Sequence, residues 1–384
     1  MRPAPRPALR QATVVLLVAA FVAGGLPVAA QAPAPALPGA PLDLAAKRGP
    51  GEGVVTLGWS APADGGDSVT HYRIYRLAGD ASATLVGTSA TPTFAHAGLS
   101  PGSSHTYRVS AVNASGEGPM SDPVTGHTWP ALSDALVRPG VQIWTEGKGW
   151  CTTNFVFHSP VTRKLYIGTA GHCVDHAIGA NVHLPSALMY HTSRVDGNRG
   201  PVFGKVAYSS FLHENVSTAP CFSVLGTPVP GLSCAVGNGN RANDFALVEI
   251  LPAWEGLVHP AVLHFGGPTA VVHPLDVPVL TEVVSYGNSP LRAGLEPTSP
   301  KRGFVTGRTA DSWTVQIYTV SPGVPGDSGS NLLLADGRAL GIVVTLAFAP
   351  LAGSNGVTSL ARALEYAEGR TGWQIELQTW DRLV

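Results

Sequence analysis

Residues 321–334, SPGVPGDSGSNLLL, decide how the C-terminal part of this 384-residue chain is interpreted. They join a glycine-rich turn to an apolar run of strand type. Gly-Asp-Ser-Gly at 326–329 is favourable turn chemistry by itself, because glycine tolerates positive φ and Asp and Ser side chains bond nearby backbone. The same turn could aim the Ser328 hydroxyl as a nucleophile. The surrounding sequence has to separate these two interpretations.

The region around this segment, from Val141 to about Ala367, is rich in short strands. The strand candidates are VQIWT (141–145), TNFVFH (153–158), KLYIGTA (164–170), DFALVEI (244–250), SWTVQIYTV (312–320), NLLLA (331–335) and ALGIVVTLAF (339–348). One segment, SLARALEYAE (359–368), has helical spacing, with Leu360, Ala363, Leu364 and Ala367 on one face. Many antiparallel strands and one terminal helix favour packed β-barrels over an α/β sheet.

A second strand-rich region precedes it, from Pro38 to about His127, and contains no cysteine. VVTLGWS, THYRIYRL and HTYRVSAV alternate apolar and polar residues, and ADGGD, SPGSS and NASGEGP separate them as turn clusters. About seven short strands in about 90 residues predict a β-sandwich.

These residues resemble a fibronectin type III domain. Trp59 falls in the second strand, and GLSPGSSHTYRVSAVNASGEGP (98–119) is similar to the family's corner between two strands and the following hairpin. His105 departs from the pattern, since the family usually has tyrosine six residues after the corner leucine, here Leu99. Tyr107 supplies the aromatic core of that strand. The resemblance implies a spacer or a binding module without catalytic residues.

Composition excludes several classes of protein. Hydrophobic residues make up 44% and charged residues 13% of the chain, with 45 Gly and 33 Pro, which is typical of a folded chain with many turns. The net charge is −1, so nothing indicates a nucleic-acid partner, and no basic amphipathic helix indicates a membrane surface.

The N-terminus has the pattern of a secretory signal peptide. Arg2, Arg6 and Arg10 precede the apolar run ATVVLLVAAFVAGGL (12–26), and Val28-Ala29-Ala30 follows Pro27. We expect cleavage after Ala30, a secreted protein, and no membrane association after cleavage. The alternative is an uncleaved anchor, because residues 12–30 are nearly long enough to span a bilayer.

The four cysteines, Cys151, Cys173, Cys221 and Cys234, predict two disulfides in an exported chain. Three pairings are open. Pairing nearest neighbours would close loops of about 22 and 13 residues, each stabilising the fold by roughly 3 kcal/mol in the chain-entropy model. The sequence contains no C-x-x-C pair, so the cysteines do not indicate a zinc site.

Two further segments carry chemical candidates. YIGTAGHCVD (166–175) presents His172 after an apolar strand, and NDFALVEI (243–250) places Asp244 directly before one. An ionised carboxylate beside that strand needs hydrogen-bonding partners, and an imidazole N–H is one. Alternatively, His172 is structural and Asp244 an ordinary turn residue. His172 and His176 also have i, i+4 metal-ligand spacing, but position 173 is Cys rather than the Glu of a zincin.

The order His172, Asp244, Ser328, in the contexts TAGHC, NDFALV and GDSGS, resembles the chymotrypsin (trypsin-like) serine protease family. The resemblance implies a catalytic triad with Ser328 as nucleophile, His172 as general base and Asp244 as orienting carboxylate. It also implies an oxyanion hole from the N–H groups of Gly326 and Ser328, and no metal or organic cofactor. The interval from His172 to Asp244 is longer than is common in the family, which predicts an insertion within residues 175–240.

Asp327 shapes the oxyanion loop in this family, often by pairing with a freed N-terminal ammonium. Here a sandwich domain precedes the barrels, and Arg138-Pro139 is a poor cleavage site. We therefore expect an internal cation or hydrogen bond for Asp327. Ser330, where many relatives have glycine, leaves the subfamily open.

The resemblance also implies a specificity pocket. Its residues would be Pro322 at the base, Val344 to Leu346 on one wall and Gly356 on the next. Because trypsin has aspartate where this chain has Pro322, we expect no preference for Lys or Arg but one for small or apolar side chains.

The predicted fold class is all-β: a fibronectin type III-like sandwich, then a chymotrypsin-like double β-barrel with a C-terminal helix. The predicted domains are a signal peptide (1–30), a Pro/Ala-rich spacer (31–41), the sandwich (42–128), a linker (129–140) and the protease domain (141–384). The predicted function is a secreted serine endopeptidase acting on protein or peptide substrates, with an extracellular polymer or protein as a candidate ligand of the sandwich. The alternatives are an inactive protease-like adhesion protein and an esterase using the same triad.

Overall fold

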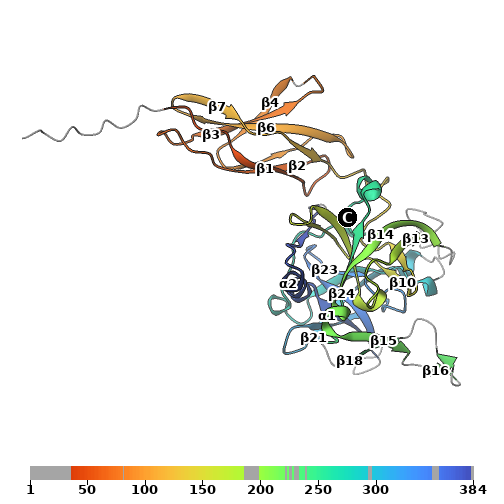
Figure 1. The fold of residues 1–384 in the computed structure, drawn as a ribbon. Helices are drawn as coiled ribbons and strands as arrows, with labels where there is room; N and C mark the ends of the chain where they lie inside the picture. Colours follow the sequence, from red (N-terminus) through yellow and green to blue (C-terminus); the bar gives the residue numbers. More distant parts are fainter. Residues whose placement is uncertain are drawn as a thin grey trace, which may run out of the picture.

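The computed structural model describes residues 36–381, except 81, 186–198, 221–222, 225–226, 229–232, 238–239, 293–295 and 348–353. The predicted signal peptide and residues 31–35 of the predicted spacer therefore lie outside the described residues. The predicted fold class is confirmed. A β-sandwich is followed by two packed β-barrels and a helix near the C-terminus (Figure 1).

The sandwich has two antiparallel sheets. One contains β1 (Leu42–Arg48), β2 (Val55–Ser60) and β5 (Thr93–His96), and the other contains β3 (His71–Leu77), β4 (Ala83–Ser89), β6 (Ser104–Asn113), β7 (Gly116–Met120) and β8 (Val124–His127). Inward-facing residues of the alternating strands form the core, where Trp59 packs edge-on against Tyr72. Tyr107 is fully buried and its hydroxyl hydrogen-bonds His96 Nδ1 at 2.9 Å, while His105 Nε2 hydrogen-bonds Ser103 Oγ at 2.8 Å.

The first barrel is an eight-stranded sheet in the order β10-β9-β13-β14-β19-β12-β11-β26. Its edge strand β10 and its penultimate strand β11 are consecutive along the chain and separated by only three residues, so the sheet must curl round on itself. The strands are β9 (Gln142–Thr145), β10 (Gly149–Thr152), β11 (Val156–Ser159), β12 (Lys164–Thr169), β13 (Asn181–Pro185), β14 (Arg199–Ser209), β19 (Ala246–Ile250) and β26 (Glu376–Leu377).

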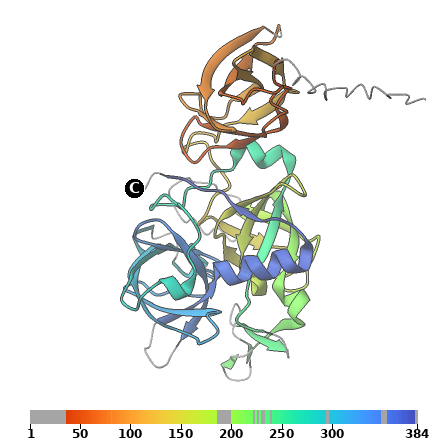
Figure 2. The same ribbon diagram turned by 90° about the vertical axis from the view of Figure 1, so that its left-hand side faces the viewer.

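An excursion from this barrel occupies part of the predicted insertion. It consists of α1 (Ser210–Glu214), β15 (Val216–Pro220), β16 (Ser223–Val224), β17 (Thr227–Pro228) and β18 (Ser233–Gly237). β15 pairs with β18, and this hairpin projects away from the barrels in both views (Figures 1 and 2).

The second barrel is closed in the order β20-β21-β22-β25-β24-β23. Its strands are β20 (Glu282–Tyr286), β21 (Pro300–Arg308), β22 (Thr314–Thr319), β23 (Asn331–Leu334), β24 (Ala339–Ala347) and β25 (Ser354–Ser359). The predicted helix is α2 (Leu360–Thr371); the four residues expected on one face are the buried ones, and Ser359 Oγ caps the helix by accepting from Arg362 N. Short 3-10 helices occur at η1 (Gly171–Cys173), η2 (Pro252–Leu257), η3 (Pro274–Asp276), η4 (Pro290–Arg292) and η5 (Glu296–Thr298).

The sandwich packs directly on the barrels, on the side away from α1 (Figure 2). Trp129 Nε1, from the predicted linker, donates to Gly49 O at 3.0 Å, and its ring belongs to the core of the first barrel. Near the C-terminus, Asp381 N donates to Pro50 O, and Glu376 pairs with Lys47 at 2.7 Å. None of the described helices is long and apolar enough to cross a membrane.

Candidate active site

His172 and Asp244 form a two-point contact at the end of the first barrel. Asp244 Oδ2 lies 2.7 Å from His172 Nδ1, and Asp244 Oδ1 accepts from His172 N at 2.8 Å. His172 lies in η1, which follows β12 after one residue, and Asp244 lies two residues before the start of β19, which pairs with β12. The pairing of these two strands therefore brings together residues that are 72 positions apart in the chain.

Asp244 is held by its neighbours. Ser210 Oγ, at the start of α1, donates to Asn243 O at 2.8 Å and accepts from Phe245 N at 3.0 Å, which fixes the backbone on both sides of the carboxylate. A Cβ on Gly171 would lie 3.1 Å from Asp244 Oδ1. Glycine at 171 thus allows the close approach that the contact requires.

The carboxylate controls the protonation of the imidazole. Burial lowers the pKa of His172, but the negative charge of Asp244 and its hydrogen bond outweigh burial, so the net shift of the pKa is upward from 6.5. Asp244 is 5% exposed, so its charge is poorly screened by water.

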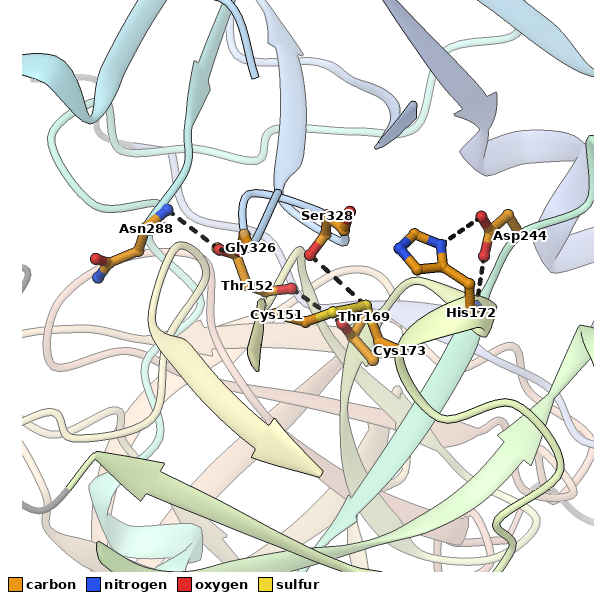
Figure 3. The surroundings of a disulfide bond; sticks show 9 residues. All are labelled: Cys151, Thr152, Thr169, His172, Cys173, Asp244, Asn288, Gly326 and Ser328. Carbon is orange, nitrogen blue, oxygen red and sulfur yellow. Dashed lines mark hydrogen bonds and ion pairs between the residues drawn. A yellow bond between two sulfur atoms is a disulfide. The ribbon is translucent and has the colours of Figure 1, made fainter. Parts of the chain in front are cut away.

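Ser328 lies at the junction of the two barrels, on the far side of the imidazole from Asp244 (Figure 3). It belongs to the loop between β22 and β23 of the second barrel, and Thr152 N, in β10 of the first barrel, donates to its carbonyl at 2.8 Å. Among the described residues, the Ser328 hydroxyl makes no hydrogen bond to His172. Catalytic hydrogen bonds are often long without substrate.

A disulfide lies next to both His172 and Ser328. Cys151 in β10 is bonded to Cys173, the neighbour of His172, and Cys173 Sγ lies 3.8 Å from Ser328 O (Figure 3). The pairing Cys151–Cys173 is thereby established among the three that the sequence left open. The side chains of Cys221 and Cys234 lie outside the described part of the chain.

The loop before Ser328 presents two backbone N–H groups, those of Gly326 and Ser328, that have no hydrogen-bond acceptor among the described residues. Ser289 Oγ hydrogen-bonds Pro325 O, and Ser330 N donates to Asp327 O at 3.0 Å. Because a trans peptide points its N–H opposite its C=O, these two contacts turn the N–H groups of Gly326 and Ser328 the other way. Gly326 has φ +96°, a conformation that favours glycine.

Asp327 is buried between two cations, which agrees with the internal cation expected for it. Arg292 Nη2 forms an ion pair with Asp327 Oδ2, and Arg292 Nε donates to Oδ1 at 3.3 Å. Lys301 Nζ lies 3.2 Å from Oδ2, and Val324 N donates to the same oxygen at 3.0 Å. Burial, which outweighs the charge of Asp327, lowers the pKa of Lys301 from 10.5 to about 8. The carboxylate thus ties the loop 324–327 to two other segments.

The structure brings only some of the predicted pocket residues together. Gly356 in β25 pairs with Thr345 in β24, next to the half-buried Val344, and Pro322 O accepts from Arg292 Nη2 at 2.9 Å. The side chain of Leu346 lies outside the described part of the chain.

The alternative role of His172 and His176 as metal ligands has no support in their contacts. His176 Nε2 hydrogen-bonds Val216 O at 2.6 Å, whereas His172 is bonded to Asp244. Cys151, His172 and Cys173 place ligand atoms within 4.8 Å of one another. The two sulfurs are joined in the disulfide, however, and are not thiolates.

Comparisons with known proteins identify the sandwich. The sequence model of the fibronectin type III domain family matches residues 39–127. This region is a fibronectin type III domain. Endoglucanase B of Cellulomonas fimi is 37% identical over 103 residues, which cover 24% of this chain and 10% of the endoglucanase. The chain therefore spans about a tenth of the length of that relative.

Two proteins of known structure each align with a portion of the chain. Protease A of Thermobifida fusca aligns with a TM-score of 0.36 and 16% identity, over 64% of this chain and 99% of that protein. A Fn3-like protein from Clostridium thermocellum aligns with a TM-score of 0.22 and 21% identity, over 24% of this chain and 95% of that protein.

Sequence reasoning missed four residues of the site: Ser289, Arg292, Lys301 and Asn355. The sequence predicts an internal cation or hydrogen bond for Asp327, but no pattern indicates which cation, because Arg292 and Lys301 reach it from 35 and 26 positions away along the chain. Asn355 is buried beside Gly356 in β25 and its Oδ1 accepts from Gly323 N at 2.8 Å; an amide next to a predicted pocket residue is the signal that points to it.

Proposed function

We propose that this protein is a secreted serine endopeptidase that hydrolyses peptide bonds through Ser328, His172 and Asp244. The observation that carries the proposal is the position of the His172 imidazole, bonded to Asp244 through Nδ1 and the backbone N–H, with Ser328 on its other side (Figure 3). Serine needs an adjacent base to act as a nucleophile, and Asp244 leaves Nε2 of the neutral imidazole as the acceptor.

The acylation step follows from these positions. Ser328 Oγ attacks the acyl carbon of the substrate, and its proton passes to His172 Nε2. The carbonyl oxygen becomes an oxyanion that accepts from the N–H groups of Gly326 and Ser328. Asp244 stabilises the imidazolium formed in this step. The C–N bond then breaks, His172 gives the proton to the leaving amine, and the acyl group remains on Ser328.

Deacylation repeats the sequence with water. His172 takes a proton from water, the hydroxide oxygen bonds to the acyl carbon, and the bond to Ser328 Oγ breaks as the proton returns to that oxygen. No residue changes its net protonation over the cycle, so the described groups are sufficient for the chemistry.

Two expectations from the sequence belong to this proposal as well. Export through the N-terminal segment agrees with the disulfide between Cys151 and Cys173, since disulfides persist outside the cytoplasm. A protein or an extracellular polymer is the proposed ligand of the fibronectin type III domain.

Hydrolysis of a peptide library by the full chain tests the proposal, with Ser328→Ala as the matched control. We expect cleavage that the variant lowers by at least about 10³-fold. Cleavage of simple esters but of no peptide would instead indicate an esterase. Absence of both activities, or equal activity of the variant, would contradict the proposal.

A further inference from the structure

The region that receives the acyl part of a substrate lies opposite His172. Since His172 must protonate the leaving amine, the leaving group lies on its side of Ser328, and the acyl residue extends the other way. There the loop 321–326 forms one boundary. Strand β24 forms the other, since Gly329 N donates to Val343 O at 2.8 Å and Val343 N donates to Ser330 O at 2.9 Å. The side chain next to the scissile carbonyl must enter between these two segments.

The side chain of Asn355 spans this gap. Its Oδ1 accepts from Gly323 N at 2.8 Å, on the loop, and its Nδ2 donates to Thr345 O at 2.8 Å, on β24. Nδ2 also lies 3.3 Å from Gly323 O. Asn355 is 2% exposed, and all of these contacts would have to break before its amide could swing aside. Displacing it would leave the buried Gly323 N–H and the part-buried Thr345 carbonyl without this partner, which is costly.

The loop cannot readily move away from the amide. Arg292 Nη2 donates to Pro322 O at 2.9 Å and Arg292 Nη1 to Ser321 Oγ at 3.1 Å, and Arg292 is itself bound to Asp327. A Cβ on Gly323 would lie 2.9 Å from Asn355 Nδ2. The amide and the loop are therefore already in close contact.

Thr345 occupies space nearer the surface. Its Oγ1 accepts from Gly356 N at 3.1 Å, and a Cβ on Gly356 would lie only 2.3 Å from this oxygen. The hydroxyl therefore fills the space that glycine at 356 would otherwise leave open. Asn355 and Gly356 are consecutive in β25, so the Thr345 hydroxyl lies on the opposite face of the strand from the Asn355 amide.

We propose that the Asn355 amide, bridging Gly323 and Thr345, limits the substrate to a small side chain, Gly, Ala or Ser, on the acyl side of the scissile bond. The inference rests on the proposed peptidase function and specifies its substrate class. A Leu or Phe side chain at this position would have to displace the amide.

Peptide p-nitroanilides that differ only in Ala, Leu or Phe before the scissile bond test the proposal on the full chain. Each preparation is first titrated with a fluorophosphonate, so that kcat/KM refers to competent Ser328. For the wild-type protein we expect kcat/KM for Ala to exceed that for Phe by at least about 100-fold. Asn355→Gly should lower this ratio at least about tenfold, and Asn355→Ser should fall between, because pocket contacts discriminate by about 10–200-fold.

Asn331→Ala is the matched control. Asn331 is a fully buried asparagine of the same barrel whose Oδ1 accepts from Tyr286 N at 3.3 Å. This control should lose stability but keep the Ala-to-Phe ratio, which separates a pocket effect from general loosening.

The titration separates the two ways of failing. A wild-type protein that titrates but cleaves the Phe or Leu substrate as well as the Ala substrate would overturn this inference and leave the peptidase proposal standing. Unchanged ratios in titrating Asn355→Gly and Asn355→Ser would do the same. A wild-type protein that does not titrate would contradict the proposed function itself, and this inference with it.

Discussion

Two buried carboxylates flank Ser328, and they differ in the partner that each one holds. Asp244 binds the imidazole of His172, whose side chain is 21% exposed, whereas Asp327 binds Arg292 and Lys301, which are both buried. Each carboxylate also accepts a backbone N–H, from His172 and from Val324. The carboxylate of Asp244 thus orients a side chain that exchanges a proton, whereas that of Asp327 holds a backbone loop in place through its ion pairs.

The largest effect should come from removing the charge beside the imidazole. In Asp244→Asn, the amide can still accept from His172 N, but it no longer fixes the imidazole tautomer or stabilises the imidazolium. We expect kcat to fall by about 10⁴-fold with little change in the thermal midpoint. Peptide hydrolysis and thermal unfolding measure the two quantities, and a loss of activity below tenfold would remove Asp244 from the mechanism.

The corresponding change at the other carboxylate should act on stability as well. Asp327→Asn leaves two buried cations without a counter-charge, so we expect the free energy of unfolding to fall by about 3–5 kcal/mol. Urea unfolding measures it, and activity should fall in parallel because loop 324–327 loses its anchor. Full stability with activity lost would show that Asp327 acts on the chemistry rather than on the loop.

Ser289 provides an intermediate test, because its hydroxyl donates to the Pro325 carbonyl and also accepts from Leu291 N at 3.0 Å. Without the hydroxyl, the peptide joining Pro325 and Gly326 can rotate and misdirect an oxyanion donor. We expect Ser289→Ala to lower kcat by about 10–100-fold while KM changes little, which is less than the loss of a whole donor. A rise in KM at constant kcat would instead indicate a role in substrate binding.

Lys301 should contribute less to the free energy of unfolding than Arg292 does, and its contribution should depend on pH. Because the pKa of Lys301 in the folded protein is about 8 and its ordinary value is 10.5, the unfolded chain binds more protons between these values. Stability from this group therefore rises with pH from about 8 to 10.5, by on the order of 1–3 kcal/mol. The difference in unfolding free energy between wild type and Lys301→Met, measured across this range, should show the rise; a difference independent of pH would contradict it.

The smallest expected effect is on the acid limb of activity. His172 must be neutral to accept a proton, and its pKa is raised above 6.5, so kcat/KM should rise with pH with a midpoint above 6.5. The residual activity of Asp244→Asn should have a lower midpoint, since the charge that raises the pKa is gone. The contribution of the His172–Asp244 pair to the free energy of unfolding has the opposite pH dependence to that of Lys301. It is fully present below pH 6.5 and decreases as the pH rises through the raised pKa of His172.

The comparison of the two carboxylates also shows what the sequence can and cannot predict. His172 and Asp244 were predictable because each stands at the end of an apolar strand in a distinctive local context, and strand pairing brings them together. The partners of Asp327 were not predictable by name, because Arg292 and Lys301 come from a 3-10 turn and a strand of the second barrel. The fold class followed from short alternating strands, one helical face and the turn residues between them. The bridge made by Asn355 depends on the register of β24 and β25, which alternation in sequence does not specify.

Labelling by a fluorophosphonate tests the central claim most directly. The full chain is treated with the probe, and the modified peptide is identified by mass spectrometry, with Ser328→Ala and His172→Ala in parallel. We predict one label per chain, on Ser328, absent from the Ser328→Ala variant and slowed by several orders of magnitude in His172→Ala. No label on the folded wild-type protein, or a label on another serine, would contradict the account.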